Sequence, residues 1–316
     1  MIQTPVACVL LCCLFVLSCG NRHNVASNIP FDLRVAYNVL DNEDSLNYEV
    51  YWMDLDGGNV ANLTQSTSVD WCIHAYDDKI YFLSDRDTSQ GFYHLFEMIP
   101  STRKVRKLFN ECVVDSWIGS RKGGTEFVIC VERHRKRAFL IIDSVGSVLN
   151  EVFETDEYSI SDPFFSPGGQ YIVYRSDKSG RNELWKMDVL GIEEKQLTDL
   201  GDKDTVGSRY YRAGPPCWVS DSSFISFTSR RKESYDIMAV SPDGNDLDLI
   251  TSTEDFNEGW HTWSPHADWI VFDGASSDAS NYDIYLMRPD GSSRIQLTHS
   301  PKYEHAPVFV KHFTKS

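Results

Sequence analysis

The stretch Trp263–Thr298 reads WSPHADWIVFDGASSDASNYDIYLMRPDGSSRIQLT, and it decides the fold. It contains short runs of β-branched and aromatic residues, such as Trp269–Phe272 and Tyr282–Met287, each bounded by Ser, Pro, Asp or Gly. Runs of this kind are typical of antiparallel strands joined by tight turns. The stretch therefore predicts one four-stranded antiparallel sheet.

The same pattern recurs along the chain, and two of its positions can be followed independently. Aromatic residues in the first strand recur at intervals of 45 to 53 residues, at Trp71, Trp117, Phe165, Trp218, Trp263 and Phe309. Residue pairs that close the fourth strand recur at Leu63–Thr64, Leu108–Phe109, Val152–Phe153, Leu197–Thr198, Ile250–Thr251 and Leu297–Thr298. Both series have six members, so the sequence predicts an all-β propeller of six four-stranded blades.

The two ends of this pattern complement each other. The chain enters at a second strand, around Val35–Tyr37, and leaves with a lone first strand, Ala306–Val310. We expect the C-terminal strand to complete the N-terminal blade, because a closed ring has no open sheet edges. No linker rich in Gly, Ser or Pro interrupts residues 34–316, which predicts one propeller domain over that range.

These motifs resemble the TolB-type propeller repeat. A typical copy of that repeat carries a W-S-P-D-G turn, an apolar strand that ends in S-D or S-R, a D-I-Y strand and an L-T close. The resemblance covers about residues 34–310 and is strongest in Ser161–Thr198 and Gly214–Thr298. It implies a propeller fold. For function it implies either a binding protein or an enzyme, because the architecture serves both.

The first residues predict export. Val6–Leu17 is an apolar run too short to span a bilayer comfortably, and the residues that end it, Val-Leu-Ser-Cys19, resemble a bacterial lipobox. The resemblance implies a lipoprotein signal peptide over 1–18, and a lipidated Cys19 with its tether over 19–33. The protein would then be anchored by lipid alone to the bacterial outer membrane, facing the periplasm or the cell surface. An ordinary cleaved signal peptide is the alternative, since no Lys or Arg precedes the apolar run.

Charge and cysteines restrict the partners. The formal net charge is −16, so the surface repels phosphate backbones and no nucleic-acid partner is expected. We expect a monomer. Beyond the anchor there are four cysteines without a CxxC pair, which disfavours a zinc cluster; they are Cys72, Cys112, Cys130 and Cys217. Cys72 and Cys217 adjoin first-strand tryptophans and are interpreted as small buried residues, with a disulfide as the alternative.

An insertion supplies the first candidate site residues. The longest interval between anchors, from Phe165 to Trp218, contains the segment Gly207–Gly214. Its candidate side chains are Arg209, Tyr210, Tyr211 and Arg212. Loops between blades meet at one mouth of the central channel, where guanidinium groups can bind carboxylate or sulfate bidentately and phenols can stack on sugars. The alternative is a surface loop whose arginines offset local acidity.

His261 is the second candidate. It stands two residues before the anchor aromatic, where the other copies have Pro163, Pro216 and Pro307. A repeat that departs from its own pattern near the channel is a functional hint, although a hydrogen-bonded structural histidine is the alternative. His305 lies in the next inter-blade loop, and Arg175 and Asp162 are placed to reach the same mouth.

The preferred hypothesis is an enzyme that cleaves or dehydrates uronate-containing oligosaccharides, sulfated ones among them, by β-elimination. Removing the proton α to a carboxylate requires a base and a group that neutralises the developing charge. Arg209 and Arg212 would neutralise the charge, and His261, Tyr210 or Tyr211 would accept the proton. Arg175, His305 and Asp162 would bind substrate.

The mouth is also similar to that of the oligogalacturonate lyase family, propeller enzymes that use a histidine-bound divalent metal. The present sequence departs from that family in having six blades instead of seven and no evident His triplet. A divalent metal is therefore not indicated, and the cofactor is left open. The other hypothesis is a non-catalytic TolB-like propeller that binds a protein or a glycan at the same mouth, for which exposed Tyr and Arg are equally suited.

Overall fold

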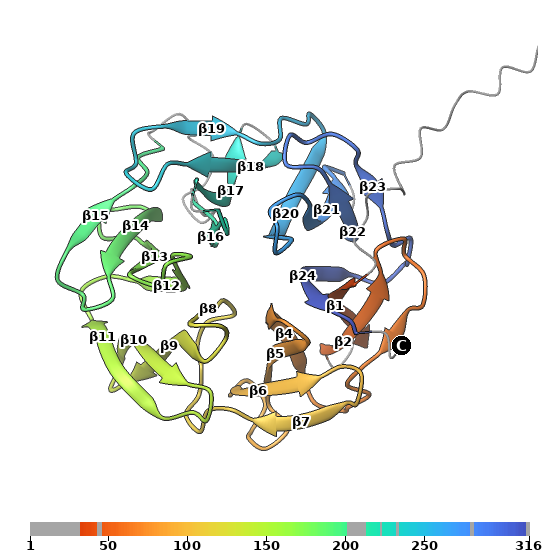
Figure 1. Cartoon of the computed structure of the whole chain (residues 1–316), viewed down its shortest axis with the longest axis horizontal. Helices are drawn as coiled ribbons and strands as arrows, with labels where there is room; N and C mark the ends of the chain where they lie inside the picture. The colour runs from red at the N-terminus through yellow and green to blue at the C-terminus, as the bar shows by residue number, and fades with distance from the viewer. Residues whose placement is uncertain are drawn as a thin grey trace, which may run out of the picture.

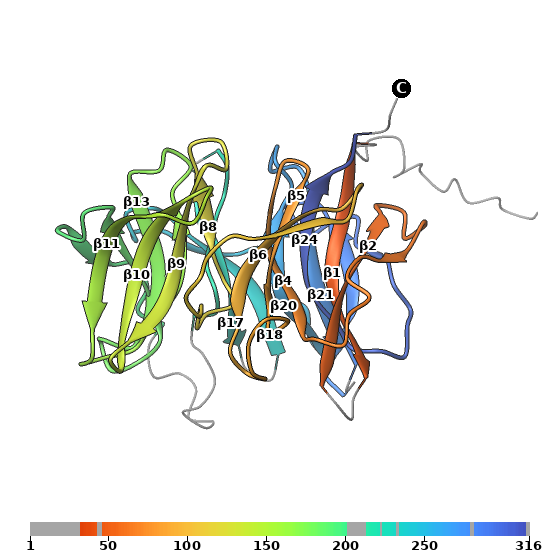
Figure 2. The ribbon, with the colours of Figure 1, turned by 90° about the horizontal axis from the view of Figure 1, so that it is seen from below.

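Six four-stranded antiparallel sheets form a ring around a central channel in the computed structural model (Figure 1). The structure describes residues 32–42, 46–200, 213–221, 223–231, 234–278 and 281–313. The prediction of an all-β six-bladed propeller is confirmed. Seen from the side, the blades stand next to one another, so the length of the strands sets the height of the ring (Figure 2). In the described part of the chain, no helix has the length and apolar character needed to cross a membrane.

Within each blade the strands follow one another from the channel outward (Figure 1). Blade 1 contains β24 (Glu304–Lys311), β1 (Leu33–Asn42), β2 (Asn47–Asp54) and β3 (Ala61–Asn62). Blade 2 contains β4 (Asp70–Tyr76), β5 (Lys79–Ser84), β6 (His94–Ile99) and β7 (Lys104–Lys107). Blade 3 contains β8 (Gly119–Arg121), β9 (Glu126–Arg133), β10 (Lys136–Asp143) and β11 (Val148–Thr155).

The other three blades follow the same order. Blade 4 contains β12 (Ile160–Phe165), β13 (Tyr171–Ser176), β14 (Glu183–Asp188) and β15 (Glu194–Gln196). Blade 5 contains β16 (Cys217–Trp218), β17 (Ile225–Arg231), β18 (Ser234–Val240) and β19 (Leu247–Leu249). Blade 6 contains β20 (Phe256–Trp263), β21 (Ile270–Ser276), β22 (Asp283–Met287) and β23 (Ile295–Gln296).

The ring closes as the sequence predicts. Strand β24 pairs antiparallel with β1, with Leu33 opposite Lys311 at one end and Val39 opposite Glu304 at the other. The N- and C-terminal parts of the propeller therefore share one sheet, in which β1 is paired on both sides and β24 is the innermost strand.

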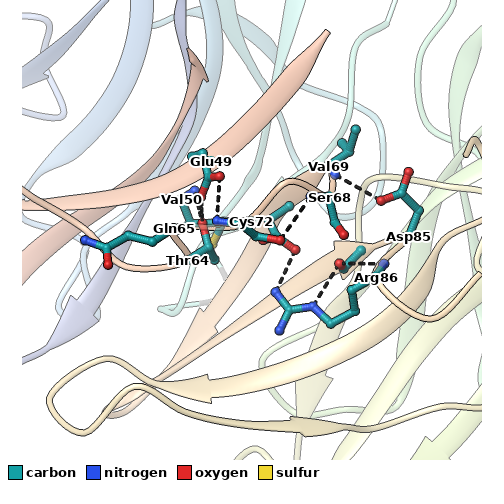
Figure 3. A network of polar contacts seen from close by, with 12 residues as sticks. Glu49, Val50, Thr64, Gln65, Ser68, Val69, Cys72, Asp85 and Arg86 are labelled. Carbon is teal, nitrogen blue, oxygen red and sulfur yellow. Dashed lines mark hydrogen bonds and ion pairs between the residues drawn. The ribbon is translucent and has the colours of Figure 1, made fainter. Parts of the chain in front are cut away.

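A polar clasp explains why the L-T close and the acidic start of the third strand recur together. In blade 4 the Thr198 hydroxyl donates to Glu183 Oε2 at 2.6 Å and accepts from the Leu184 amide at 2.9 Å. Thr64 makes the equivalent contacts with Glu49 and the Val50 amide in blade 1 (Figure 3). The third and fourth strands are thereby joined beyond the last ladder bond.

Blades 2 and 3 have Phe109 and Phe153 where the other blades have this threonine. A phenylalanine has no hydroxyl, so these two blades cannot form this threonine clasp.

The core lies between neighbouring blades. At the closure seam the fully buried Trp269 and Val271 of blade 6 pack with Val35 and Met53 of blade 1. Such interfaces repeat around the ring, and burial of apolar surface, worth about 25 cal/mol per Å², is the main term that stabilises them. Cys72 and Cys217 are buried as predicted, and Cys72, Cys112, Cys130 and Cys217 are all free thiols, so the disulfide alternative is not realised.

Candidate functional site

A cavity of about 550 Å³ lies at the channel mouth. Its walls come from the inter-blade loops and from the turns between second and third strands, as the blade topology predicts. The aromatic side chains of its lining are Tyr235, Trp260, Tyr282 and Tyr303. Its ionisable side chains other than tyrosine are Asp115, Arg137, Asp162, Arg175, Asp177, Glu258, Asp273 and His305.

Asp273 organises the wall formed by blades 6 and 1. Its buried carboxylate accepts the Trp260 amide at 3.0 Å and the Ala306 amide at 2.8 Å. His305 Nδ1 lies 2.6 Å from Asp273 Oδ2, an ion-pair contact that lacks hydrogen-bond alignment. A carboxylate held by two amides cannot turn away, so it fixes the imidazole at the edge of the cavity.

Gly259 makes room for this arrangement. A Cβ atom at position 259 would lie 1.8 Å from Asp273 Oδ1, a distance that no real contact allows. A glycine in the strand is therefore required by the close approach of the backbone to the carboxylate.

The opposite wall contains a pair of buried carboxyl groups. The Asp162 amide donates to the Asp115 carboxylate, and the Asp162 side chain forms an ion pair with Arg175. Burial, together with the neighbouring charge of Asp162, raises the pKa of Asp115 well above its usual range. Asp162 adopts φ of 55°, a left-handed conformation that aims its amide at Asp115. The Arg175 guanidinium lies beside this pair and offsets its negative charge.

Aromatic rings from four blades meet across the channel. The Trp260 ring lies 4.9 Å from the His305 ring, 5.4 Å from that of Trp117 and 6.4 Å from that of Trp71, measured between centroids. The contacts with Trp117 and Trp71 are edge-to-face, the geometry that aromatic pairs favour. This aromatic cluster thus links blades 6, 1, 2 and 3 at the cavity.

Three of the predicted site residues are brought together. His305, Arg175 and Asp162 all line the cavity. His261 does not: its ring is buried, and Nε2 lies 2.8 Å from the Ser226 hydroxyl in the neighbouring blade. Burial lowers the pKa of His261 to about 4, so the ring is neutral near pH 7. The other predicted residues lie outside the described part of the chain; they are Cys19, Arg209, Tyr210, Tyr211 and Arg212.

Sequence reasoning missed Asp115, Asp273 and the aromatic lining. Trp260 and Tyr303 each lie shortly before the anchor aromatic of a first strand, next to the histidines that were singled out. The available signal was their proximity to His261 and His305, which the repeat pattern already assigned to the channel mouth.

The described residues do not fit a histidine-bound metal. Within residues 32–313, apart from the undescribed gaps, no group of three or more His, Cys, Asp or Glu side chains is placed to hold a metal ion. We therefore derive no chemistry through a metal.

Comparison with protein families gives one match over most of the chain. Residues 26–311 match the PD40 family, described as the TolB beta propeller domain. Among curated proteins, the chain is 23% identical over 147 residues to the uncharacterized protein Atu1656 of Agrobacterium fabrum. That alignment covers 46% of the chain and 47% of the relative, so it spans about half the length of each.

Solved structures share the fold. The structure of TolB from Acinetobacter baumannii superposes with a TM-score of 0.68 at 18% identity, over 90% of this chain and 69% of that one. An oligogalacturonate lyase from Vibrio parahaemolyticus superposes with a TM-score of 0.54 at 11% identity, over 84% of this chain and 79% of the lyase. At these identities the similarity shows the propeller architecture alone.

Proposed function

The chain belongs to the TolB β-propeller domain family, and from that premise we propose that it is a non-catalytic binding propeller whose mouth cavity holds a positively charged segment of a partner protein. The observation that carries this proposal is the charge of the cavity. Its described lining contains five carboxylic acids but only two arginines. Two of the acids are ion-paired, Asp162 with Arg175 and Glu258 with Arg294, so Asp115, Asp177 and Asp273 remain against Arg137 and the imidazole of His305.

A cleft in which one sign of charge predominates attracts ligands of the opposite sign, even where the charged atoms themselves are buried. The protein as a whole carries a formal net charge of −16, so the long-range field acts in the same direction. A uronate or sulfate group would meet this field unfavourably, whereas a Lys or Arg side chain would be attracted.

The aromatic lining suits the same ligand. Tyr282 and Tyr303 pack edge-to-face at 5.5 Å, and Tyr303 continues to the His305 ring at 5.5 Å. Aromatic faces attract ammonium and guanidinium groups, and tyrosine gives contact area at low entropic cost. The cavity therefore offers both a negative field and cation-binding faces.

The location follows from the leader sequence. We propose that the protein is exported and anchored through Cys19 to the bacterial outer membrane, which would place the partner in the cell envelope. Mass spectrometry of the mature N-terminus would show a diacylglyceryl-modified Cys19. A free N-terminus cleaved elsewhere would favour an ordinary signal peptide instead.

A peptide-binding assay tests the proposed function. The purified mature protein is used to select binders from phage-displayed random linear peptides, and the best binders are synthesised for calorimetry. We expect enrichment of Lys and Arg, and affinity that falls several-fold when salt is raised from 0.15 M toward 0.5 M. Substitution Asp177→Asn should weaken binding, because it removes a charge at the cavity but keeps the oxygen that accepts the Ser159 amide at 2.7 Å.

The control is Asp290→Asn. Asp290 is an exposed acid in the turn between β22 and β23, on the opposite face, and its amide analogue keeps the bond from the Ser292 amide. Selection of no peptide, or equal effects of the two substitutions, would refute the proposal.

The His305–Asp273 contact favours a second candidate function. An imidazole held by a buried carboxylate is a common arrangement for a proton acceptor. Within a β-eliminating enzyme on uronates, His305 would then take the role that the sequence suggests for His261. Incubation with pectic, alginate and sulfated algal oligosaccharides tests this, because an unsaturated uronate product absorbs in the ultraviolet. A rising signal that His305→Ala abolishes would establish the enzyme, and a flat trace for every substrate would eliminate it.

A further inference from the structure

A second cavity, of about 580 Å³, lies beside the mouth cavity and differs from it in chemistry. Its lining is mainly apolar and comes from blades 1 to 3; the side chains include Leu46, Tyr48, Trp71, Phe92, Tyr93 and Val114. We refer to it as the apolar groove. Ionisable side chains occur around most of the mouth cavity. Among the described residues that line the apolar groove, Asp115 is the only one with a carboxylate.

Three apolar side chains of the groove are exposed. Leu46 is 62% exposed, Phe92 59% and Val114 38%. Leu46 and Phe92 lie in the turns between the second and third strands of blades 1 and 2, and Val114 lies in the loop from β7 to β8. All three loops belong to the mouth face, so three separate segments place apolar side chains beside one another. Clustered exposure of this kind marks an interaction site, whereas scattered exposed apolar residues do not.

The two cavities are adjacent. Val114, Asp115 and Ser116 line both of them, so one occupant on the mouth face can contact both cavities. An extended peptide projects successive side chains in opposite directions, which allows neighbouring residues to occupy different pockets. One segment can therefore place a cationic side chain in the mouth cavity and an apolar side chain in the apolar groove.

We propose that the apolar groove binds an apolar side chain, aliphatic or aromatic, of the same positively charged segment that the mouth cavity holds. The inference rests on the proposed function and extends it to a composite ligand. Charge complementarity selects this occupant over a second copy of the chain. Two copies, each with a formal net charge of −16, would bring acidic mouths together.

The test uses the synthetic peptide that is selected most strongly from the phage library. The inference predicts that selected peptides share an apolar residue near a Lys or Arg, and that replacing the apolar residue by Ser lowers affinity. Substitutions Phe92→Ser and Leu46→Ser in the protein should each lower affinity about ten-fold or more, because the apolar side chain of the peptide would lose the apolar surface against which it is buried. Both side chains are largely exposed, so neither change should unfold the blade.

Matched controls are Leu190→Ser and Ile192→Ser. These side chains are 64% and 76% exposed, but they lie in the turn between β14 and β15, on the face away from the mouth. They remove comparable apolar surface from the protein without touching the groove, and binding should not change.

The outcomes separate the inference from the proposed function. Peptides that bind with Asp177-dependent affinity but are unaffected by Phe92→Ser and Leu46→Ser would overturn the apolar groove and leave the proposed function standing. The absence of any selected peptide would overturn both. A concentration-dependent dimer in sedimentation that Phe92→Ser abolishes would identify a second copy as the occupant and also overturn the inference.

Discussion

The indole N–H of Trp117 donates a hydrogen bond of 2.7 Å to the carbonyl oxygen of Pro216. Trp117 lies in the loop that leads into blade 3, and Pro216 in the loop that leads into blade 5. The bond therefore passes blade 4 on the channel side and joins two blades that are not neighbours. Both residues are buried, so no water is available to replace the bond if it is lost.

Replacing Trp117 by Phe tests the importance of this link. We expect Trp117→Phe to lower the free energy of unfolding by about 1 to 3 kcal/mol, because the Pro216 carbonyl would remain buried without its donor. Urea unfolding followed by circular dichroism measures the loss. Trp185→Phe is the control, since the Trp185 indole N–H has no hydrogen-bond partner in the described structure. If both variants lose the same free energy of unfolding, the loss comes from the smaller ring and the hydrogen bond to Pro216 contributes nothing.

The threonine clasp predicts a second stability effect. Thr198→Val keeps the shape of the side chain but removes the hydroxyl that bridges Glu183 and the Leu184 amide. We expect a loss of about 1 to 3 kcal/mol, because a buried carboxylate and a buried amide both lose a partner. Thr102→Val, in an exposed turn, should change stability by less than about 0.5 kcal/mol. If the blade 4 clasp does not stabilise the fold, Thr198→Val and Thr102→Val should lower the free energy of unfolding by the same small amount.

Most of the fold, but not the clasp, could be predicted from the sequence. The anchor aromatics, the turn residues and the L-T close are local and periodic, so their spacing predicts the number of blades, the order of the strands and the closure of the ring. The reason that threonine recurs could not be predicted, because Glu183 and Thr198 lie fifteen residues apart and meet only after two strands have paired. Blades 2 and 3 have phenylalanine in place of this threonine, so the recurrence of the L-T close is itself incomplete.

The candidate site was harder to predict than the fold. His305, Arg175 and Asp162 could be placed at the mouth from strand position alone, since that position fixes the face of the ring. The direction in which a side chain points could not be predicted in the same way. Strand β20 has an irregular register between Glu258 and His261, and the His261 ring is buried against Ser226, whereas Trp260 lines the cavity. A one-residue irregularity exchanges the two faces of a strand, and period alone does not reveal it.

The buried His261 predicts a pH dependence of stability. Its pKa in the folded protein is about 4, below the usual value of 6.5 for a free histidine. Between these two values the unfolded chain binds a proton that the folded protein does not, so stability falls as pH decreases through 6.5 toward 4. This contribution amounts to about 2 kcal/mol between pH 7 and pH 5.

The measurement compares wild type with His261→Gln, whose amide can still bond to the Ser226 hydroxyl. Glu304 titrates with the opposite sign, because burial raises its pKa to about 7, but it is present in both proteins and its contribution cancels in the comparison. The stability difference between the two proteins should therefore change by about 2 kcal/mol between pH 7 and pH 5 in favour of the variant. A difference that is independent of pH would mean that His261 is solvated and titrates normally.

The carboxyl pair at the cavity predicts a rescue. Arg175→Met removes the cation that pairs with Asp162 and leaves two buried carboxyl groups beside each other, Asp162 and Asp115. We expect a loss of about 3 kcal/mol or more in the free energy of unfolding at pH 7, which is the usual effect of removing one partner from a buried ion pair.

Adding Asp162→Asn removes one of the two carboxyl groups with little change in shape, so the double variant should be more stable than Arg175→Met alone. Lower pH should also restore stability to Arg175→Met, because protonation of Asp115, whose pKa burial raises, removes the repulsion within the pair. Urea unfolding of the four proteins at pH 7 and pH 5 tests both effects. The result that contradicts this prediction is additivity: at both pH values, the double variant would lose as much free energy of unfolding as Arg175→Met and Asp162→Asn lose together. Arg175 would then stabilise the wall by packing and not by offsetting the carboxyl pair.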